Sequence, residues 1–571
     1  MDKKELIKNF NFALKAQKEG KNLEAIKFFE KIIKVEPNHF PTNFFLGSLY
    51  AQNDNFKHAI KFLSKAQSLN PKIPDVHNNL GRIYLRLGQL DKATISLNRA
   101  IEIKPNFAAA FCNLGLVNDK LGKIEEAINC FKKSIEINSK DGISYYNLGN
   151  LYKKINDIIN SEKFYLLSIK SNPKFFAPYN NLLDLYERTN KRDKLIERIK
   201  SAEAIFKNNI TLKLVKGKDL FNLKKLREAI ELLENFNFEK SEIIKEQLRI
   251  AILAKSHDQI GEFEKAFKYF EKANEISLNT NNKFFNKKKT LKIIEKRTNF
   301  FKDDKVKNWK KFNSKSKKSS PIFLIGFPRS GTTLLDTILR SHPLIEVIEE
   351  KPIIENWIKE IQKEVDSDLK YLHNINENSA QKFRKMYFDL RNKNIKKNNV
   401  KKIFIDKMPL NIIHAGEILR IFPDAKFIMA LRHPCDCVLS CFMQSFKMND
   451  AMSNFFNLED SANFYDSVMK IWQLYMNTFS INQYTVKYED VVTNFEKSIN
   501  NILDFLEVAW SKNILEFYKT AQVDRLINTP SYDQVNKPIY KKSLDKWKNY
   551  KDQMQNVLPI LNKWVEKYNY S

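Results

Sequence analysis

The chain has 571 residues, of which 43% are hydrophobic and 29% charged, and its formal net charge at pH 7 is +30. This length predicts two or three folded domains, and a content of only 13 Gly and 17 Pro residues excludes a collagen-like or largely disordered protein. The excess Lys residues are spread along the whole chain, so we favour solvated lysine faces over a nucleic-acid groove and expect no nucleic-acid partner.

The cysteines and the N-terminus indicate a cytoplasmic protein. Five cysteines is an odd number, and their spacing fits neither a disulfide framework nor a zinc site. The first residues, MDKKELIKNF, lack the apolar segment of a secretory signal, and no apolar run reaches the roughly 18 residues of a membrane span. We therefore expect a reducing compartment and no transmembrane segment.

Residues 5–208 repeat with a period of 34 residues. Each unit is predicted to form two amphipathic helices, with small Gly and Ala residues where the helices cross and Pro at the start of the next unit. The period is carried by Pro37, Pro71, Pro105 and Pro173, by Gly47, Gly81, Gly115 and Gly149, and by Ala25, Ala59, Ala93 and Ala127.

This pattern closely resembles the tetratricopeptide repeat (TPR). The resemblance implies an α-helical superhelix over residues 1–280, with clear repeats in 5–208 and degenerate helical hairpins in 209–280. Such a solenoid has an extended concave groove, which we expect to bind a protein or peptide partner. The alternatives are that the array packs against the rest of its own chain or against a second copy, as in a homodimer.

Three asparagines, Asn79, Asn113 and Asn147, share the 34-residue spacing. Two roles are open for them: polar contacts in the groove, or contacts that join successive repeats.

A different pattern begins after residue 280. Residues 281–320 are rich in Lys and Ser and are predicted to be a basic linker. Short apolar strands then alternate with helices, which predicts an α/β domain with a P-loop-like parallel sheet over 321–571. The expected strands are Ile322–Phe327, Lys402–Ile405, Lys426–Leu431 and Tyr484–Lys487, and the expected helices include Thr332–Arg340, Asn411–Ile421 and Cys435–Phe446.

The segment GFPRSGTT, residues 326–333, joins the first strand to a helix. It keeps the glycine spacing of a Walker A loop but has Thr332 in place of the Lys that reaches the β- and γ-phosphates of a triphosphate. Backbone N–H groups and the helix dipole still favour an anion, and Arg329 adds guanidinium donors. The predicted anion-binding residues are Arg329, Ser330, Gly331, Thr332 and Thr333.

A second phosphate site is predicted from Arg432, at the end of a strand, and Ser440, eight residues later. At about 3.6 residues per turn, Ser440 lies roughly two helical turns along and can return near the strand end. The alternative is a surface Arg and a helical Ser that bind nothing.

Together, PRSGTT and the later LRHP-x5-S look like the sulfotransferase family that uses 3′-phosphoadenosine 5′-phosphosulfate (PAPS). The resemblance implies that the first loop holds the 5′-phosphosulfate and that Arg432 and Ser440 hold the 3′-phosphate. Within the family, the chain looks closest to the protein-tyrosine sulfotransferase branch.

Further site residues are implied by this branch. Glu350 in HPLIEVIEE matches its catalytic base, Lys407 in IDKMP matches the lysine that stabilises the sulfuryl group, and Ser531 in SYDQVNKP matches a serine on the transition-state oxygens. Tyr488 in KYEDVV and Lys546 in SLDKW match cofactor-binding residues, and Arg329 serves both catalysis and binding. Pro352 replaces the arginine that follows the paired glutamates in that branch.

The sequence thus predicts sulfuryl transfer from PAPS, without a metal, to an acceptor with a free hydroxyl: a protein tyrosine, a glycan, a lipid or a small molecule. Rival bases are Glu349 and His414. The alternative functions are a P-loop kinase or ATPase, which Thr332 disfavours, and a TPR interaction scaffold with an inactive nucleotide-binding domain. Cys435, Cys437 and Cys441 are expected to serve packing, with redox sensitivity as the alternative.

Overall fold

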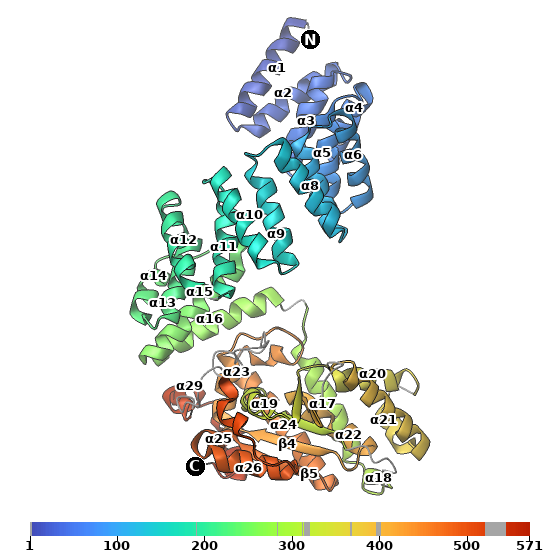
Figure 1. The fold of residues 1–571 in the computed structure, drawn as a ribbon, viewed down its shortest axis with the longest axis vertical. Coiled ribbons are helices and arrows are strands. Elements are labelled where there is room, and N and C mark those ends of the chain that lie inside the picture. The colour runs from blue at the N-terminus through green and yellow to red at the C-terminus, as the bar shows by residue number, and fades with distance from the viewer. Residues whose placement is uncertain are drawn as a thin grey trace. The chain divides into compact units, whose positions relative to one another are not determined.

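The computed structural model describes residues 3–189, 191–281, 284–310, 312, 320–365, 368–395, 401–519 and 544–570 (Figure 1). The chain forms two compact units, Met1–Lys216 and Gly217–Ser571. No helix within the described ranges has both the length and the apolar character needed to cross a membrane.

The N-terminal part of the chain is a series of helical hairpins, as the 34-residue period predicts. The crossings of α5 with α6 and of α7 with α8 depend on residues without a side chain: a Cβ added to Gly115 would lie 2.7 Å from the Phe131 ring, and one added to Gly81 would lie 2.5 Å from Leu97 Cγ. The helices are α1 Lys3–Lys18, α2 Asn22–Val35, α3 Phe40–Gln52, α4 Phe56–Leu69, α5 Pro74–Arg86, α6 Leu90–Ile103, α7 Ala108–Lys120, α8 Ile124–Ile137, α9 Gly142–Lys154, α10 Ile158–Ser171, α11 Phe176–Arg188, α12 Arg192–Ile205, α13 Ile210–Asn222 and α14 Leu226–Glu234.

The periodic asparagines join successive repeats. The Asn113 side chain donates a hydrogen bond to Asn78 Oδ1 at 2.8 Å, and Asn79 donates to Ser48 Oγ at 3.2 Å. Asn147 makes the equivalent contact to the preceding repeat. Of the two roles left open by the sequence, the structure supports the contact between repeats.

The second unit contains a five-stranded parallel sheet of order β2-β3-β1-β4-β5. The strands are β1 Ile322–Gly326, β2 Ile345–Glu349, β3 Ile403–Lys407, β4 Lys426–Leu431 and β5 Asn482–Lys487. This confirms the predicted parallel sheet and adds β2, where the alternating apolar Ile345 and Val347 were a short signal that the sequence prediction missed. Because β3 and β4 pair with opposite sides of β1, the strand order reverses there, and ligands of open parallel sheets bind at such a point.

Two apolar cores cover the two faces of the sheet, because neighbouring residues of a strand point to opposite sides. Leu324 belongs to the core that contains α19 and α26, whereas Phe323 and Ile325 belong to the larger core on the other face. The helices of this region are α19 Thr332–Arg340, α20 Ile353–Gln362, α21 Glu377–Asn392, α22 Ala415–Ile421, α23 Pro434–Phe442, α24 Leu458–Thr478, α25 Tyr488–Thr493, α26 Phe495–Phe505, α29 Lys551–Met554 and α30 Leu558–Lys567, with 3₁₀ turns η2 Leu369–Asn374, η3 Pro409–His414, η4 Met452–Phe455, η5 Lys512–Glu516 and η6 Lys546–Tyr550.

Part of the range predicted to be a basic linker is a packed helix. Helix α17, Lys287–Phe301, precedes the short α18, Asp304–Lys307, and its Phe301 ring lies 5.1 Å from the Tyr475 ring. Arg297 of α17 donates to Glu417 of α22 at 2.8 Å, and both side chains are buried. The prediction of a solvated connector was wrong for this stretch, because a narrow apolar face that includes Ile294 is hidden among many lysines.

The last helical hairpin packs on the sheet region. It consists of α15, Ile243–Ile260, after a 3₁₀ turn η1 at Lys240–Glu242, and α16, Phe263–Asn281. Ala254, Ala266 and Phe270 of this hairpin are buried in the same core as Phe323 of β1. The hairpin and the sheet therefore share one hydrophobic core.

Candidate active site

The loop between β1 and α19 has a backbone that few residues can adopt. Gly326, Arg329 and Gly331 have φ values of 157°, 70° and 98°. A Cβ on Gly326 would lie 2.6 Å from the carbonyl oxygen of Ala430, and one on Gly331 would lie 2.8 Å from the Tyr488 ring. The two glycines therefore allow the loop to fold tightly against β4 and the start of α25.

Four of the predicted site residues meet around this loop. Arg329 Nε donates to Ser440 Oγ of α23 at 3.0 Å, and Arg432 Nη1 donates to the Arg329 carbonyl oxygen at 3.4 Å. The Arg432 guanidinium lies 5.0 Å from the centre of the Tyr488 ring. Residues that are more than 150 positions apart in the sequence thus surround one loop.

The loop also has hydrogen-bonding capacity that protein atoms leave unused. The buried Ser330 hydroxyl has no hydrogen-bond partner among the described residues. Gly331 caps α19 without a side-chain hydrogen bond to the first turn, where Thr332 is buried and Thr333 half-buried. An uncapped helix N-terminus beside an orphaned hydroxyl fits an anionic group such as a phosphate.

A second cluster lies at the ends of β2 and β3. The Lys407 side chain is fully buried, and its ammonium lies 2.8 Å from Glu350 Oε1, 3.7 Å from Glu349 Oε1 and 3.8 Å from Asp336 Oδ2. The Glu350 backbone N–H donates to the Lys407 carbonyl oxygen at 2.8 Å. Asp336, which also contacts Arg340, was not predicted from the sequence, because only the turn of α19 brings it next to Lys407.

The two neighbouring glutamates differ in their surroundings. Burial raises the pKa of Glu349, and the nearby Asp336 carboxylate raises it further. The Glu350 side chain is 40% exposed, compared with 10% for Glu349. Glu350 has a φ of 48°, a conformation that residues with a Cβ rarely adopt and that is frequent at functional positions.

His414, a rival base in the sequence prediction, belongs to a structural network. Its Nδ1 lies 3.1 Å from Arg297 Nη2 and 3.6 Å from Glu417 Oε1. These contacts tie α17 to α22 and the 3₁₀ turn before it, so they give His414 a packing role.

Two predicted residues come from the C-terminal segment. Lys546 forms an ion pair with Asp258 of α15, with its ammonium 2.6 Å from Asp258 Oδ2. The prediction for Lys546 as a cofactor ligand did not include this partner, which lies 288 residues away. Ser531 lies outside the described residues.

The three cysteines beside the loop are buried thiols. Burial raises the pKa of Cys435 to about 12 and raises the pKa of Cys437 and Cys441 above the ordinary thiol range. Cys441 donates to the Pro328 carbonyl oxygen at 3.3 Å. Since the thiolate is the reactive form, these features favour packing over redox sensitivity.

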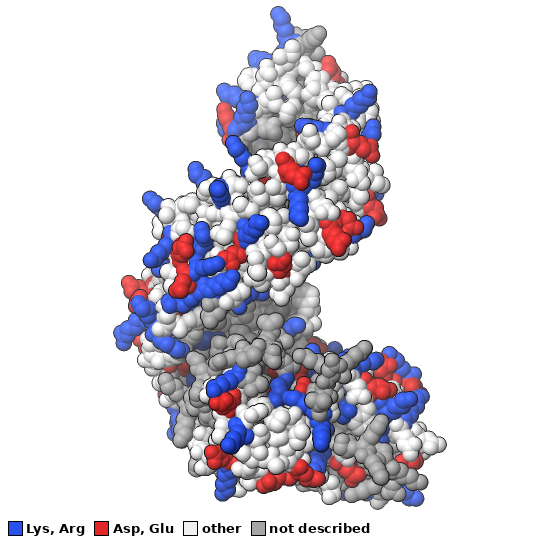
Figure 2. All heavy atoms as spheres, viewed as in Figure 1, with Lys and Arg blue, Asp and Glu red and all other residues white. Residues whose placement is uncertain are grey.

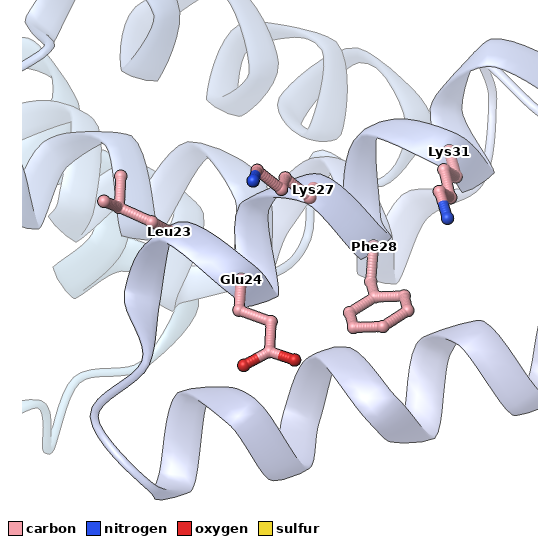
Figure 3. A pocket seen from close by; sticks show the side chains of 5 residues that line it. All are labelled: Leu23, Glu24, Lys27, Phe28 and Lys31. Carbon is pink, nitrogen blue, oxygen red and sulfur yellow. The ribbon is translucent and has the colours of Figure 1, made fainter.

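A separate hollow of about 500 Å³ lies on the first helical hairpin. It is lined by Leu23, Glu24, Lys27, Phe28 and Lys31 of α2 (Figure 3). The Phe28 ring also stacks on Phe12 of α1 at 5.7 Å. None of the predicted transferase residues belongs to this hollow.

On the face that Figure 2 shows, Lys and Arg are interspersed with Asp and Glu and do not form a patch of one charge sign. Within the described ranges, no three His, Cys, Asp or Glu side chains gather as a metal site requires.

Models of known protein families match both the N-terminal and the C-terminal part of the chain. Residues 321–512 match the model of the sulfotransferase family. Models of the tetratricopeptide repeat match residues 40–73, 62–94, 81–122, 108–141, 130–163 and 251–280.

Several curated proteins are similar to this chain at low sequence identity. An uncharacterized protein of Aquifex aeolicus is 28% identical over 355 residues, which cover 60% of this chain and 44% of that protein. Protein-tyrosine sulfotransferase 2 of Gallus gallus is 26% identical over 41% of this chain and 64% of its own length, and protein-tyrosine sulfotransferase 1 of Danio rerio is 26% identical over 40% and 65%. The chain thus spans less than two thirds of each of these relatives.

Among solved structures, the crystal structure of MamA aligns to 28% of this chain and 95% of its own, with 26% identity and a TM-score of 0.26. The family models thus match a tetratricopeptide repeat region in the N-terminal part of the chain and a sulfotransferase-family domain over residues 321–512.

Proposed function

We propose that the protein transfers a sulfuryl group from PAPS to the hydroxyl of an acceptor. The observation that carries this proposal is the juxtaposition of an anion-binding loop, bounded by Arg329, Arg432 and Ser440, with a Lys407–Glu350 pair at the same edge of the sheet. The match of residues 321–512 to the sulfotransferase family supports it.

The chemistry assigns a role to each group. The acceptor oxygen attacks sulfur, the bond from sulfur to the bridging oxygen of the 5′-phosphate breaks, and 3′-phosphoadenosine 5′-phosphate leaves. Glu350 takes the acceptor proton, because its carboxylate is exposed enough to meet the acceptor. Arg329 and Lys407 stabilise the charge that grows on the bridging oxygen. Ser531 keeps the role that the family resemblance implies.

Binding of PAPS as a substrate fits the loop. The unpartnered Ser330 hydroxyl and the uncapped α19 would hold the 5′-phosphosulfate, and Arg432, Ser440 and Tyr488 would hold the nucleotide end. We propose that no metal takes part, because Arg and Lys supply the positive charge at this edge of the sheet.

We also propose that the repeat array binds a protein or peptide, which is either the acceptor or a partner that brings it. The hollow lined by Leu23, Glu24, Lys27, Phe28 and Lys31 of α2 is one place where such a chain could dock (Figure 3). A second copy of the protein is the alternative occupant. We also propose a cytoplasmic location, which is typical of proteins with free cysteines, and no nucleic-acid partner.

Transfer of label from PAPS to acceptors captured by the full chain tests the proposal. Arg329→Ala is expected to lower kcat/KM by about 10² to 10³-fold, whereas Lys363→Ala, at an exposed ion pair of α20, leaves it unchanged. Unchanged turnover in Arg329→Ala would refute the assigned role. Binding of Mg-ATP without PAPS would indicate a kinase or ATPase, and nucleotide binding without turnover on any acceptor would indicate a scaffold.

A further inference from the structure

The last helical hairpin contacts the helix that carries Ser440. The Phe267 ring of α16 stacks on Phe442 at 4.9 Å, and the Asn274 side chain donates to the Phe442 carbonyl oxygen at 2.9 Å. Phe442 is the last residue of α23, two positions after Ser440. The hairpin therefore supports the C-terminal end of a helix that borders the proposed nucleotide site.

One carboxylate of the same hairpin holds the C-terminal segment. Asp258 Oδ2 lies 2.6 Å from the Lys546 ammonium, and Asp258 Oδ1 accepts a hydrogen bond from the Tyr550 hydroxyl at 2.7 Å. The side chains of Asp258 and Lys546 are 13% and 31% exposed, and Tyr550 is fully buried. A lysine side chain without such a partner samples many rotamers. The partly buried, charge-assisted contact with Asp258 therefore orients the Lys546 side chain.

Trp547, the residue after Lys546, connects this ion pair to the loop between β1 and α19. The Trp547 backbone N–H donates to Asp436 Oδ1 at 2.8 Å, and Asp436 Oδ2 lies 3.9 Å from Arg432 Nη2. Arg432 in turn donates to the carbonyl oxygen of Arg329. A continuous series of contacts thus runs from the repeat-like hairpin to the loop after β1.

We propose that Asp258 is a positioning residue for nucleotide binding: it holds Lys546 so that the ammonium meets the 3′-phosphate of the nucleotide. This inference rests on the proposed function. A lysine ammonium has three N–H donors, so contact with Asp258 leaves others for phosphate oxygens. The hairpin that ends the repeat region is then a structural part of the nucleotide site.

The test measures dissociation constants of two nucleotides for the full chain by calorimetry. 3′-Phosphoadenosine 5′-phosphate carries the 3′-phosphate, and adenosine 5′-phosphate lacks it. Asp258→Asn keeps the shape of the side chain and is expected to weaken binding of the first nucleotide about tenfold, within the range of typical couplings between sites, and to leave the second unchanged. Glu264→Gln is the matched control, because Glu264 lies in the same hairpin and pairs with the exposed Lys268.

Lys546→Gln separates positioning from general stability. It is expected to produce the same tenfold loss, and Asp258→Asn added to it should have no further effect, since both changes act through one ammonium. If Asp258→Asn does not fold, unchanged binding of 3′-phosphoadenosine 5′-phosphate by Lys546→Gln still overturns the inference.

Other results also contradict it. Tighter binding by Asp258→Asn would mean that Asp258 competes with phosphate for Lys546, and an equal loss for both nucleotides would mean a purely structural role. Failure of the unmodified protein to bind 3′-phosphoadenosine 5′-phosphate would remove the proposed function and this inference together. Normal binding by the unmodified protein with no change in Asp258→Asn would remove the inference alone.

Discussion

The two units of the chain differ in the charge that they bury. In the described part of residues 3–216, every buried polar side chain is Ser, Thr, Asn or His. The second unit buries acidic and basic side chains from α15 to α24, namely Glu246, Arg249, Arg297, Asp336, Asp406, Lys407, Glu417, Arg420, Arg432, Asp436 and Asp466.

The contacts made within each unit account for this difference. In the first unit, each repeat stacks on its neighbour through apolar contacts between crossing helices and through neutral amide side chains. Neither kind of contact requires a charged group to be buried. Burying a charge is unfavourable unless it is paired, so a domain retains buried charges where they serve chemistry or a specific junction. Lys407 and Arg432 lie in the proposed site, whereas Arg297 and Glu417 join α17 to the sheet region.

The largest effect on turnover is expected from a change of Glu350, the proposed base beside the buried Lys407. Glu350→Gln preserves the shape of the side chain but removes the proposed base, so kcat should fall about 10² to 10⁴-fold in the labelled-PAPS assay. Glu346→Gln, on the strand that precedes Glu350 and paired with Lys401, is the control and should retain activity. If Glu350→Gln stays active while Glu349→Gln does not, the base is the buried neighbour.

The next largest effect is expected on stability, from a change in the packing of the hairpin α15–α16. Phe270→Ala should lower the free energy of unfolding of the second unit by about 3 to 5 kcal/mol, because Phe270 is 5% exposed in the core shared with the sheet. Phe12→Ala changes a ring that is 44% exposed on α1 and should cost far less. Equal effects of the two changes in chemical denaturation would show that the hairpin is not part of that core.

Buried charge also predicts a pH dependence of the stability of the second unit. Burial raises the pKa of Asp406 on β3 from 3.8 to about 7. The folded state therefore holds a proton that the unfolded state releases, and stability falls as pH rises from about 4 to about 7, by up to about 4 kcal/mol for this group. Asp406→Asn should remove this part of the decline in urea unfolding at several pH values. Asp91→Asn, at an exposed position of α6, should not change the pH profile.

The smallest effect is expected at a repeat crossing. Gly81→Ala places a Cβ 2.5 Å from Leu97 Cγ and should destabilise the repeat unit by about 1 to 3 kcal/mol without changing nucleotide affinity. Gly88→Ala tests backbone strain alone, because Gly88 has a φ of 72° and no neighbouring atom within 4 Å of the added Cβ. A change in nucleotide affinity in Gly81→Ala would show coupling to the transferase region.

Features that depend on neighbouring residues could be predicted from the sequence, and features that depend on distant contacts could not. The 34-residue period marked Gly81 and Gly115 as crossings, and the spacing in GFPRSGTT marked the loop after β1. No local pattern shows that Asp336 turns toward Lys407 or that Asp258 reaches Lys546, because the fold alone brings these pairs together. Helix α17 was missed because its apolar stripe is narrow and its lysines dominate the composition.

The regular glycine crossings have a consequence for how such a chain can change during evolution. A repeat contacts mainly its sequence neighbours, so gain or loss of one 34-residue unit before residue 217 keeps every remaining glycine opposite its apolar partner. An insertion of any other length within a helix would displace that pairing. The array can therefore lengthen or shorten in whole modules while the sequence of the sheet region stays unchanged.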